Sequence, residues 1–457
     1  MAGTNLYRTP TARTNNQKFT YSCWFKKSTT GTDEYFVTNY ESGNNFGYIN
    51  NGNTDKFVIY DKAGGTERLQ AESNFVIRDT NAWYHLVYSV DSTASSNRVK
   101  FYINGVDRFS DFTVATAMAQ NSSVGFQQGT TSNGFRVGSQ QTGSATFNGL
   151  MSHVNFVDGL QLDASAFGET DSTTGEWKIK TSPTVSEYGN NGFFILKDGN
   201  SVTDQSGKGN NFGIGGSVGS LTKTEDCPSN VFNTLNPLDN YYSNYTYAQG
   251  NTAVSSTSSN RTYVTSTLGM PSGKYYWECK LDSTLNSGTG GASTSVYVGI
   301  TGQTPISPSQ FPSDGTCFNC VMNTNGQVYS NGSTIGSAMG SGWSNSTIVM
   351  MAYDADNNKM YFGKDGTWLN SGDPTSGSTG TGAFTPTTSA SATPIGVYMP
   401  QWGVDWNASY VSSFNFGNGY FGTTAVSSAG TNASGNGIFE YDVPTGYTAL
   451  STKGLNL

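Results

Sequence analysis

Charge is scarce in this chain. Of its 457 residues, 12% are Asp, Glu, Lys or Arg, about half the share found in an average soluble domain. Long apolar runs are missing too, since none approaches the roughly 18 residues of a membrane-spanning helix. The residues from Met1 to Pro10 lack the apolar core of a secretory signal. The sequence therefore predicts neither membrane insertion nor a secretion signal at its start.

Basic clusters are also lacking. The formal net charge is −8, and the basic pair that we find is Lys26-Lys27. A nucleic-acid groove needs a stripe of Lys and Arg, so nucleic acid is not expected as a partner. Residues 1–225 hold 18 basic and 20 acidic side chains, a balance of −2, whereas residues 226–457 hold 6 and 12, a balance of −6. The second part is thus the less suited to a polyanionic surface.

Cysteine and histidine are few. The chain has 5 Cys and 2 His, too few for a disulfide scaffold or for the usual four ligands of structural zinc. Cys317 and Cys320 form a CxxC pair, for which a redox role is the alternative. Cys23, Cys227 and Cys279 are isolated. We expect small buried thiols in a reducing compartment.

Glycine and aromatic residues take the place of charge. The chain has 56 Gly, 26 Tyr and 26 Phe, whereas disordered chains are poor in aromatics. Turn-forming residues combined with aromatic and β-branched residues indicate an all-β protein. A chain of 457 residues exceeds the usual size of one domain, so we expect at least two.

A first block of strands opens with Phe19–Lys26, whose period of two predicts a half-buried strand. Trp83–Asp91 predicts another, a polar turn headed by Asp91 follows, and Arg98–Ile103 returns. Asn104-Gly105, a strong hairpin signal, ends this return. Further expected elements are strands at Tyr35–Tyr40, Phe46–Asn50, Lys56–Tyr60 and Met151–Val157, and a helical turn over Asp163–Gly168.

A second block repeats this order. Its expected strands are Lys274–Leu281, Val296–Thr301, Thr347–Tyr353 and Lys359–Lys364, with a polar turn at Asp354–Asn358 and a hairpin signal at Asp365-Gly366. We interpret the blocks as two copies of one architectural plan.

The pattern predicts a fold class and three segments. We expect two antiparallel β-sandwiches in tandem, over residues 1–180 and 241–457. Residues 181–240 are rich in Gly and Asn, and we expect an ordered connector there, with Phe212, Val231, Phe232 and Leu235 to bury.

Three motifs of the first block resemble the laminin-G/concanavalin A-like lectin family: Trp83–Val87, Val99–Gly105 and Phe147–Phe156. The second block resembles a SPRY domain, through Ser272–Glu278, Val298–Ile300, Met351–Asp354, Met360–Phe362, Gly366–Leu369 and Phe414–Gly417. The resemblance implies a concanavalin A-like jelly roll for each block.

The combination is similar to a family of virion proteins from phages of marine and freshwater bacteria, in which a lectin-like domain precedes a SPRY domain. The motifs are Arg8–Pro10, Phe167–Trp177, Asp204–Asn211, Asn233–Asp239 and Phe439–Pro444, and the resemblance covers nearly the whole chain. It implies a place on the virion surface as a tail-fibre, spike or appendage protein, assembled in the host cytoplasm. Other virion proteins and further copies of this chain are the expected partners.

A catalytic centre is not expected. His85 and His153 both lie in predicted strands, where a histidine is more often structural than catalytic. The nearest pair of glycosidase-type carboxylates comes from Glu169, Asp171 and Glu176, in a Thr/Ser/Gly-rich segment. This segment indicates a solvated loop that caps a short helix.

A metal site is not assigned. Asp354–Asn358 begins like a calcium loop, but Lys359 and Asp365 stand where an EF-hand needs Gly and Glu. A polar β-turn explains the segment better. No cofactor is expected, and calcium in another loop stays open.

Candidate binding residues follow from aromatic side chains beside polar ones. Gln401–Tyr410 is expected to be a loop between strands, in which Trp402, Trp406 and Tyr410 stack on sugar while Asp405 and Asn407 bind its hydroxyls. An equally favoured alternative is that one Trp fills the sandwich end. A tyrosine cluster is the candidate for protein contact: Tyr241, Tyr242, Tyr245 and Tyr247.

These observations lead to one functional hypothesis. The chain is a non-enzymatic virion surface protein that recognises a host-surface glycan or protein through loops at the sandwich end. The alternative is a structural capsid-decoration or adaptor protein that docks other virion proteins. A polysaccharide-degrading enzyme is the third and weakest hypothesis.

Overall fold

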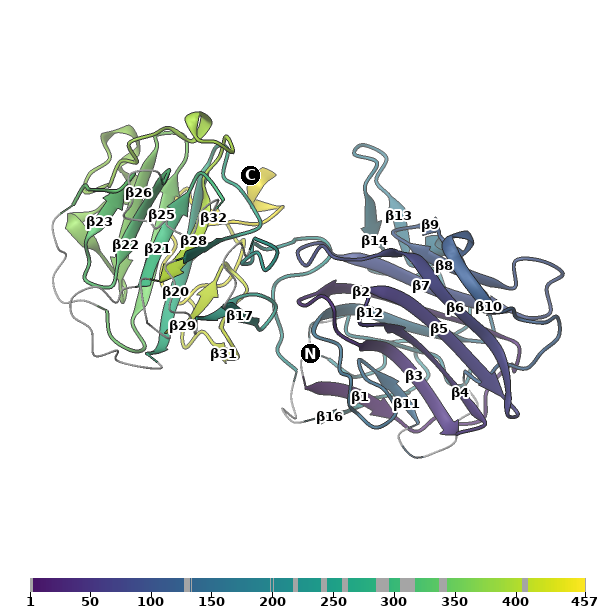
Figure 1. Cartoon of the computed structure of the whole chain (residues 1–457). Coiled ribbons are helices and arrows are strands. Elements are labelled where there is room, and N and C mark those ends of the chain that lie inside the picture. Colours follow the sequence, from purple (N-terminus) through teal and green to yellow (C-terminus); the bar gives the residue numbers. More distant parts are fainter. Residues whose placement is uncertain are drawn as a thin grey trace. The chain divides into compact units, whose positions relative to one another are not determined.

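The computed structural model describes residues 3–126, 132, 134–197, 199, 201–216, 221–239, 245–256, 262–284, 296–304, 317–336, 343–404 and 410–456. Within these ranges the chain forms β-strands and short 3₁₀ turns, so the all-β prediction is confirmed (Figure 1). The chain divides into two compact units. The first comprises Met1–Lys223 with Cys227–Ser229, and the second comprises Thr224–Asp226 with Asn230–Leu457. No helix in the described ranges is long and apolar enough to cross a bilayer.

The first unit contains two antiparallel sheets, which we call sheet A and sheet B, and a small hairpin. Sheet A has the order β10 (Phe112–Thr116), β6 (Thr66–Val76), β5 (Lys56–Ala63), β4 (Asn45–Asn51), β3 (Glu34–Ser42), β11 (Phe135–Val137), β1 (Thr4–Arg8), β16 (Gly213–Gly216). Sheet B has the order β15 (Phe193–Ile195), β12 (Gly149–Asp158), β2 (Lys18–Lys27), β7 (Tyr84–Asp91), β8 (Val99–Ile103), β9 (Val106–Asp107). The hairpin pairs β13 (Gly168–Thr170) with β14 (Trp177–Ile179), and the 3₁₀ turns are η1 (Phe109–Asp111) and η2 (Ala164–Ala166).

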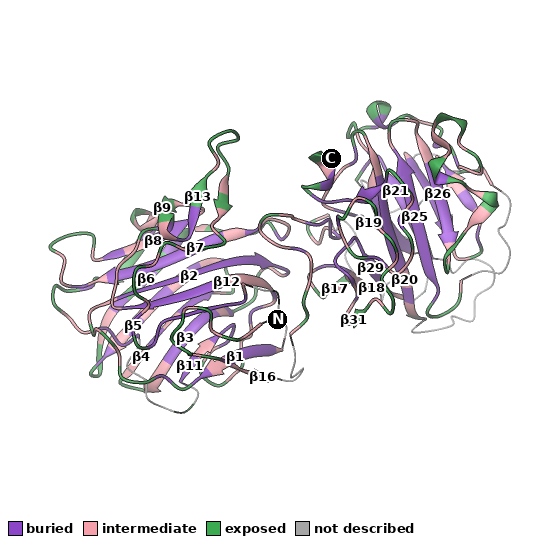
Figure 2. Ribbon diagram, turned by 180° about the vertical axis from the view of Figure 1, so that it is seen from behind, coloured by how far each residue is buried: buried purple, intermediate pink, exposed green. Residues whose placement is uncertain are grey.

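Strand β2 shows how the core of the first unit forms. One phase of its alternation fills the core between the sheets: Phe19, Tyr21, Cys23 and Phe25. The other phase, expected to face solvent, is buried as well: Thr20, Ser22, Trp24 and Lys26. The half-buried prediction is therefore wrong, because the segment 160–188 covers the outer face of sheet B with Phe167, Trp177 and other apolar groups. Figure 2 shows buried residues along β2 and β7 and exposed residues at the tip of the hairpin.

The segment expected as a connector is divided between the units. Strand β15 pairs with β12 at the edge of sheet B, and β16 pairs with β1 at the edge of sheet A. Phe193 and Phe212 belong to the core of the first unit. Phe232 and Leu235 are buried in the second unit. The segment 181–223 thus completes the first sandwich instead of linking two finished ones.

The second unit also contains two main sheets, sheet C and sheet D. Sheet C has the order β17 (Tyr245–Ala248), β18 (Ala253–Ser256), β29 (Tyr410–Asn415), β20 (Lys274–Thr284), β25 (Ile348–Asp354), β26 (Lys359–Lys364), β27 (Thr367–Trp368), with β32 (Thr448–Ala449) beside β20. Sheet D has the order β19 (Thr262–Thr265), β28 (Met399–Val404), β21 (Val296–Thr301), β22 (Asn319–Asn323), β23 (Val328–Ser330), β24 (Ser333–Thr334). The remaining short elements are β30 (Tyr420–Phe421), β31 (Thr424–Ala425), η4 (Leu369–Ser371), η5 (Pro374–Thr379), η6 (Ala390–Ala392) and η7 (Gly454–Asn456).

The outer face of sheet C is covered by the C-terminal part of the chain. Phe439 and Tyr447 pack on Tyr276 and Tyr361 there. Beneath them, the carboxylate of Glu278 accepts hydrogen bonds from the Tyr276 hydroxyl (2.9 Å), the Asn415 amide (3.1 Å) and the backbone N–H groups of residues 440 (3.0 Å) and 441 (2.9 Å). This buried carboxylate fastens the C-terminal segment to the sheet.

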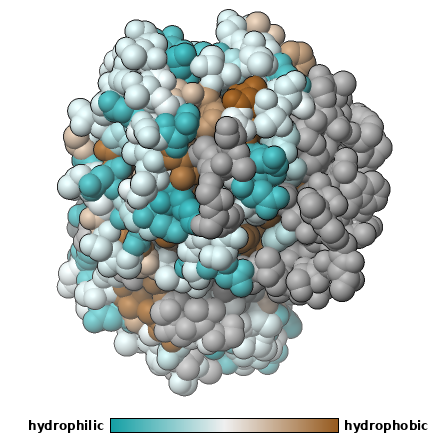
Figure 3. Space-filling view, turned by 90° about the vertical axis from the view of Figure 1, so that its left-hand side faces the viewer, coloured by the Kyte–Doolittle hydropathy of each residue, from teal (hydrophilic) through white to brown (hydrophobic). Residues whose placement is uncertain are grey.

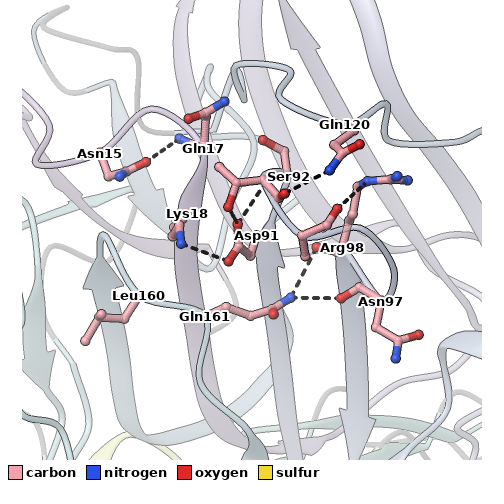
Figure 4. Close-up of polar contacts among 12 residues, drawn as sticks. Asn15, Gln17, Lys18, Asp91, Ser92, Asn97, Arg98, Gln120, Leu160 and Gln161 are labelled. Carbon is pink, nitrogen blue, oxygen red and sulfur yellow. Dashed lines mark hydrogen bonds and ion pairs between the residues drawn. The ribbon is translucent and has the colours of Figure 1, made fainter.

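An ion pair recurs at the same place in each sandwich. Lys18 and Asp91 face each other across β2 and β7, with Nζ 2.9 Å from Oδ2 (Figure 4). Lys274 and Asp354 face each other across β20 and β25 at 3.2 Å. In both units a polar turn then leads into the returning strand. The expected repetition of one architectural plan is visible in these matching contacts.

The hairpin signals also match. Asn104 and Asp365 both adopt a positive φ, 48° and 47°. The side chain of Asn104 accepts a hydrogen bond from the backbone N–H of His85 (2.8 Å), and that of Asp365 accepts one from Ile348 (2.9 Å). Asn and Asp tolerate this left-handed conformation, which explains their place before Gly in both turns.

Candidate functional site

Trp402 does not lie in a binding loop. It belongs to β28, where it is fully buried, and its Nε1 donates to Ser412 Oγ at 2.9 Å. Its ring packs edge-on against Tyr245, with ring centroids 5.4 Å apart. Tyr410 begins β29 and is buried in the same core. The assignment of Trp402 and Tyr410 to an exposed sugar site is therefore corrected, because both side chains point into the sandwich.

Other predicted residues fall outside the described ranges. These are Asp405, Trp406 and Asn407 of the expected loop, and Tyr241 and Tyr242 of the tyrosine cluster. Tyr245 is buried in the core of the second unit, and Tyr247 is partly buried against that core. Tyr245 is thus unavailable for a protein contact, whereas the remainder of the cluster stays a prediction.

His85 is a structural residue at the outer face of sheet B. Its Nδ1 accepts a hydrogen bond from Trp177 Nε1 at 3.0 Å, so its other nitrogen carries the proton and donates to Ser22 Oγ at 2.9 Å. Trp24 stacks on the imidazole, with ring centroids 4.8 Å apart. Burial, with a small contribution from His153, lowers the pKa of His85 to about 3. A histidine that stays neutral and is closed off from solvent cannot act as a general base near neutral pH.

The candidate carboxylates lie on the hairpin instead of in the expected loop. Glu169 belongs to β13, Asp171 starts the turn, and Lys178 of β14 lies within 3.9 Å of Glu169 and 3.0 Å of Asp171. Hydrogen bonds from Lys178 and from two backbone N–H groups lower the pKa of Asp171 to about 2. A glycosidase acid needs a raised pKa, so this pair is unsuited to acid catalysis.

The calcium-like segment is a turn. Asp354 accepts from the backbone N–H of Asn357 at 3.0 Å and from its side chain at 2.9 Å, and it pairs with Lys274. These contacts use the oxygens that a cation would need. Within the described ranges, no group of three or more Cys, His, Asp and Glu side chains is arranged to hold a metal ion.

Four of the five thiols have the expected buried environment. Cys23, Cys279, Cys317 and Cys320 are buried and unbonded to one another, and Cys227 is partly exposed. Burial raises the pKa of the Cys23 thiol to about 12 and raises that of Cys320 further. Thiols of this kind are poor nucleophiles, which does not favour a redox role for the CxxC segment.

A group of aromatic side chains lies on the outer face of sheet A, the face turned away from the core. Its members are partly exposed and come from β3, β4 and β5: Tyr35, Tyr40, Phe46, Tyr48 and Tyr60. The alternate residues Ile49 and Ile59 point into the core. The register places Tyr48 directly opposite Tyr60, and Phe46 opposite Tyr40. We call this group the aromatic face.

Three rings of the aromatic face are nearly parallel. Tyr60 lies 5.4 Å from Tyr48 and 5.3 Å from Phe46 between ring centroids, at interplanar angles of 12° and 20°. Phe46 and Tyr48 are 6.5 Å apart at 13°. Tyr35 and Tyr40 contact this group at 5.2 and 6.1 Å with tilted rings. The face therefore presents a contiguous aromatic surface.

Hydrogen-bonding groups surround these rings. The Tyr60 hydroxyl bonds to Glu67, and burial together with this bond raises the pKa of Tyr60. Gln70 is the cross-strand neighbour of Tyr60 on β6. Lys62 Nζ lies 5.9 Å from the Phe46 ring centroid. The face thus combines flat apolar surface with a carboxylate, an amide and an ammonium group.

A loop contacts β3 and β11 next to the strands of the aromatic face. Thr38, opposite Tyr48 on β3, donates to the backbone oxygen of Ser139 at 3.0 Å and is fully buried. A Cβ placed on Gly143 would lie 3.5 Å from Nη1 of Arg136. The segment 139–143 therefore lies against Thr38 of β3 and Arg136 of β11.

The sheet faces of the first unit differ in exposure. The outer face of sheet B is covered by the segment 160–188, whereas the outer face of sheet A presents the partly exposed rings. Sequence reasoning missed this site. The alternation of Phe46 and Tyr48 with Ile49 was visible, but the meeting of β4 and β5 side chains depends on strand register, which local pattern does not give.

Comparisons with known proteins agree with the expected lectin-like content. Residues 2–164 match the family model described as the concanavalin A-like lectin/glucanases superfamily. A search of curated proteins finds no match.

Solved structures to which the chain is similar include the SPRY domain of human HERC1, at 16% identity and a TM-score of 0.29, covering 39% of this chain and 96% of that one. A putative carbohydrate binding protein from Bacteroides ovatus is 16% identical with a TM-score of 0.31, covering 48% and 59%. Domain 4 of AbnA, a GH43 extracellular arabinanase from Geobacillus stearothermophilus in complex with arabinotriose, is 21% identical with a TM-score of 0.23, covering 32% and 63%. Each is a likeness of fold alone.

Proposed function

We propose that this protein binds a glycan on the aromatic face of its first unit. The observation that supports this most directly is the contact of three nearly parallel, partly exposed rings, Phe46, Tyr48 and Tyr60. Sugar rings present flat C–H patches that pack on aromatic faces, with hydroxyls at their rims. Every member of the aromatic face lies within residues 2–164, the part of the chain that matches the lectin-like family model.

The polar surroundings suit sugar hydroxyls. Glu67 accepts hydrogen bonds, Gln70 both donates and accepts, and Lys62 donates. Ligand sites combine apolar walls with a few such polar groups that fix orientation. The strand register sets aromatic and polar groups side by side across β4, β5 and β6. An extended glycan chain fits a surface that runs across neighbouring strands.

Binding without catalysis is the favoured chemistry. The carboxyl group nearest in sequence to Tyr60 is Asp61, which points into the core and accepts backbone N–H bonds from Gly125 and Phe126, both at 2.8 Å. Burial raises its pKa to about 7, but it is closed off from the aromatic face. Asp171 on the hairpin is ionised and partly exposed, and neither residue offers a glycosidase-type pair.

We further propose that the glycan belongs to a host cell surface and that the protein acts on a phage virion, for example as a tail-fibre or appendage component. The support for this setting is the order of a lectin-like block before a SPRY-like block and the motifs noted in the sequence. Many weak sites on one particle would act together. A docking role as a decoration or adaptor protein is the second candidate.

The experiment is a binding assay of the purified protein on intact host cells, before and after surface polysaccharide is stripped. The test variant is Tyr48→Ala with Tyr60→Ala, and the control variant is Tyr420→Ala, a partly exposed tyrosine of the second unit. We expect saturable binding that is lost on stripping. Each ring contributes roughly tenfold or less, so the double variant should bind up to about a hundredfold more weakly.

Two outcomes would contradict the proposal. Binding by the double variant at the wild-type level would exclude the aromatic face. Absence of binding by folded wild-type protein, with retained incorporation into particles, would favour the docking role.

A further inference from the structure

A buried lysine ends the row of core residues on β2. Phe19, Tyr21, Cys23 and Phe25 fill the core between sheets A and B, and Lys27 is the next residue in the same phase. Lys27 is 1% exposed. Lysine is almost never buried to this extent unless its charge is paired. Neither the sequence motifs nor the proposed glycan site accounts for this ammonium group.

The partner of Lys27 is Asp55, in the turn between β4 and β5. Lys27 Nζ lies 2.9 Å from Asp55 Oδ1, and the same oxygen accepts from Gly31 N at 2.9 Å and from Asn51 Nδ2 at 3.4 Å. Burial raises the pKa of Asp55, but the hydrogen bonds from Gly31, Lys27 and Asn51 outweigh it, so the pKa is lowered. One ionised oxygen thus contacts an amine nitrogen and a carboxamide nitrogen, both in buried side chains.

A buried carboxyl group lies opposite the carboxamide. The register pairs Glu34 of β3 with Asn51 of β4. Oε1 of Glu34 accepts from the hydroxyls of Thr29 (2.6 Å) and Thr32 (2.9 Å), whereas Glu34 Oε2 and Asn51 Oδ1 have no hydrogen-bond partner among the described residues. Burial raises the pKa of Glu34. A protonated carboxyl group that donates to a carboxamide oxygen makes the carbonyl carbon more electrophilic.

We propose that Lys27 and Asn51 form an intramolecular isopeptide bond, with Asp55 as the catalytic residue. The three groups are those that such a reaction needs: an amine as the nucleophile, a carboxamide as the acceptor, and a carboxylate in contact with both nitrogen atoms. The fold holds them together before reaction, which replaces a bimolecular encounter by a local one. The proposal is independent of glycan binding.

Proton transfer through Asp55 carries the reaction. Asp55 accepts a proton from the Lys27 ammonium, and the resulting amine attacks Cγ of Asn51. The bond from Cγ to Nζ forms, and the bond from Cγ to Nδ2 breaks. Protons that leave Nζ pass through Asp55 to the departing nitrogen, which is released as an ammonium ion. No atom is oxidised or reduced, and Asp55 ends as the carboxylate with which it began.

The charge of Asp55 stays compensated after the lysine has lost its own. Arg78 Nε lies 3.7 Å from Asp55 Oδ2, and the backbone N–H of Gly31 continues to donate to Oδ1. The positive charge of Lys27 leaves with the ammonium ion. The reaction therefore does not strand a buried carboxylate without a partner.

A competing reaction is restrained by the fold. The peptide nitrogen that follows an asparagine can displace the same ammonia and form a succinimide, and Gly52 follows Asn51. Here the N–H of Gly52 donates to Lys56 O at 3.0 Å and is held in the turn between β4 and β5. The Lys27 amine is therefore the favoured nucleophile.

The bond would join the two sheets of the first unit. Lys27 ends β2 of sheet B, and Asn51 ends β4 of sheet A. A covalent link across the core restricts the unfolded chain as a disulfide does. The five cysteines of this chain form no disulfide, so the isopeptide would supply a cross-link that thiols do not.

The experiment is peptide mapping of the full-length protein by mass spectrometry. Residues 28–55 contain neither Lys nor Arg, so trypsin releases residues 28–56 from an unlinked chain. We expect instead a peptide of residues 27–56 that is lighter by one ammonia, because trypsin does not cut after an acylated lysine. Chymotrypsin, which cuts between these residues at Tyr40 and Phe46, should leave two segments joined through Lys27 and Asn51.

The test variant is Asp55→Gly, which removes the carboxylate and suits the positive φ of 61° at this position. It should slow the cross-linking at least about a hundredfold. The matched control is Asn50→Ala, a change at the neighbouring residue in the opposite phase of β4, which should cross-link as the wild type does. Asn51→Ala should give residues 28–56 at the full mass of that sequence.

Four results would overturn the proposal. The first is a wild-type peptide 28–56 at its full mass. The second is a peptide that loses ammonia but is still cut after Lys27, which would show a succinimide at Asn51. The third is a linked peptide lighter by one water, which would show a bond between Lys27 and Asp55. The fourth is cross-linking of Asp55→Gly at the wild-type rate.

Discussion

Lys18 and Asp91 form an ion pair across β2 and β7 at the end of the first sandwich, and Lys274 and Asp354 repeat it across β20 and β25 of the second. The pairs differ in exposure. Asp91 is 17% exposed, and hydrogen bonds from Thr93 and Lys18 outweigh its partial burial, so its pKa is lowered. Asp354 is 1% exposed. One architectural position thus holds a surface ion pair in one unit and a nearly buried carboxylate in the other.

Removal of the two lysines should therefore have unequal effects. Lys274→Met leaves the buried Asp354 without its cation, and we expect a loss of about 2–3 kcal/mol in the free energy of unfolding. Lys18→Met should cost about 1 kcal/mol or less. Urea denaturation of both variants measures the difference. Equal losses in the free energy of unfolding of the two variants would contradict the conclusion that the burial of Asp354 makes its ion pair the stronger one.

Trp402 should behave as a core residue. Trp402→Ala removes a fully buried side chain and its bond to Ser412, so we expect a loss of about 3–5 kcal/mol in the stability of the second unit. Glycan binding by the first unit should be unchanged at a temperature where the variant is folded. Thermal unfolding and the cell-binding assay together check this. Loss of binding with unchanged stability would restore the loop hypothesis.

Two buried carboxyl groups should make stability depend on pH. Burial raises the pKa of Asp61 and of Glu278 to about 7 in each case. Because the folded state then binds more protons than the unfolded state, stability is highest below about pH 4 for this contribution and falls as the pH rises through 7. Each group contributes a slope of at most about 1.4 kcal/mol per pH unit.

The measurement is the free energy of unfolding at pH 5, 6, 7 and 8. Asp61→Asn should flatten the dependence of the first unit and leave that of the second unit unchanged. Glu278→Gln should do the reverse, with an added loss because the new amide N–H₂ faces hydrogen-bond donors. A free energy of unfolding that rises from pH 5 to pH 8 would contradict the raised pKa values of Asp61 and Glu278.

Trp177 should anchor the hairpin. Trp177→Phe removes the donor to His85 Nδ1 and leaves a buried acceptor unpaired, at a cost of about 1–3 kcal/mol. Amide exchange over β13 and β14 should become faster than in Lys178→Ala, a change at an exposed neighbouring position. The ¹⁵N shifts of His85 should report a proton on Nε2 in the wild type. Unchanged exchange in Trp177→Phe would contradict this anchoring role.

The positions of the strands along the chain were predictable because they depend on the local sequence pattern. Val296–Thr301 and Lys359–Lys364 are strands with the predicted bounds, and both Asn104 and Asp365 make the predicted hairpin turns. Alternation also held enough information for Trp402, since Trp402 and Val404 share one phase of β28 and point inward together. Trp402 looked like part of a sugar-binding loop because it stands near Gly and Asp. The alternation of β28 shows instead that it is a core residue.

The aromatic face depends on information that a single strand lacks. Tyr48 and Tyr60 meet because β4 and β5 pair in one register, and a shift by one residue would place Ile59 opposite Tyr48. The hydrogen bond from Arg8 to Asn210 likewise joins residues that are far apart in the chain. The covering of sheet B by the segment 160–188 was likewise hidden, because nothing local shows which outer face a later segment will cover.

The β13–β14 hairpin has a practical consequence. Its tip is exposed, and its turn is closed by the bond from Asp171 N to Glu176 O at 2.7 Å, while Trp177 fixes its base (Figure 2). The hairpin lies on the outer side of sheet B, and the aromatic face lies on the outer side of sheet A. A biotin-acceptor peptide inserted between Thr173 and Thr174 would therefore attach the protein to a biosensor chip through the side opposite the aromatic face. Every immobilised molecule would then present its rings to the analyte stream, and surface-plasmon measurements of glycan affinity could be made with uniformly oriented protein. Figure 3 shows apolar residues in small separate patches among more polar ones, and small patches limit non-specific adsorption.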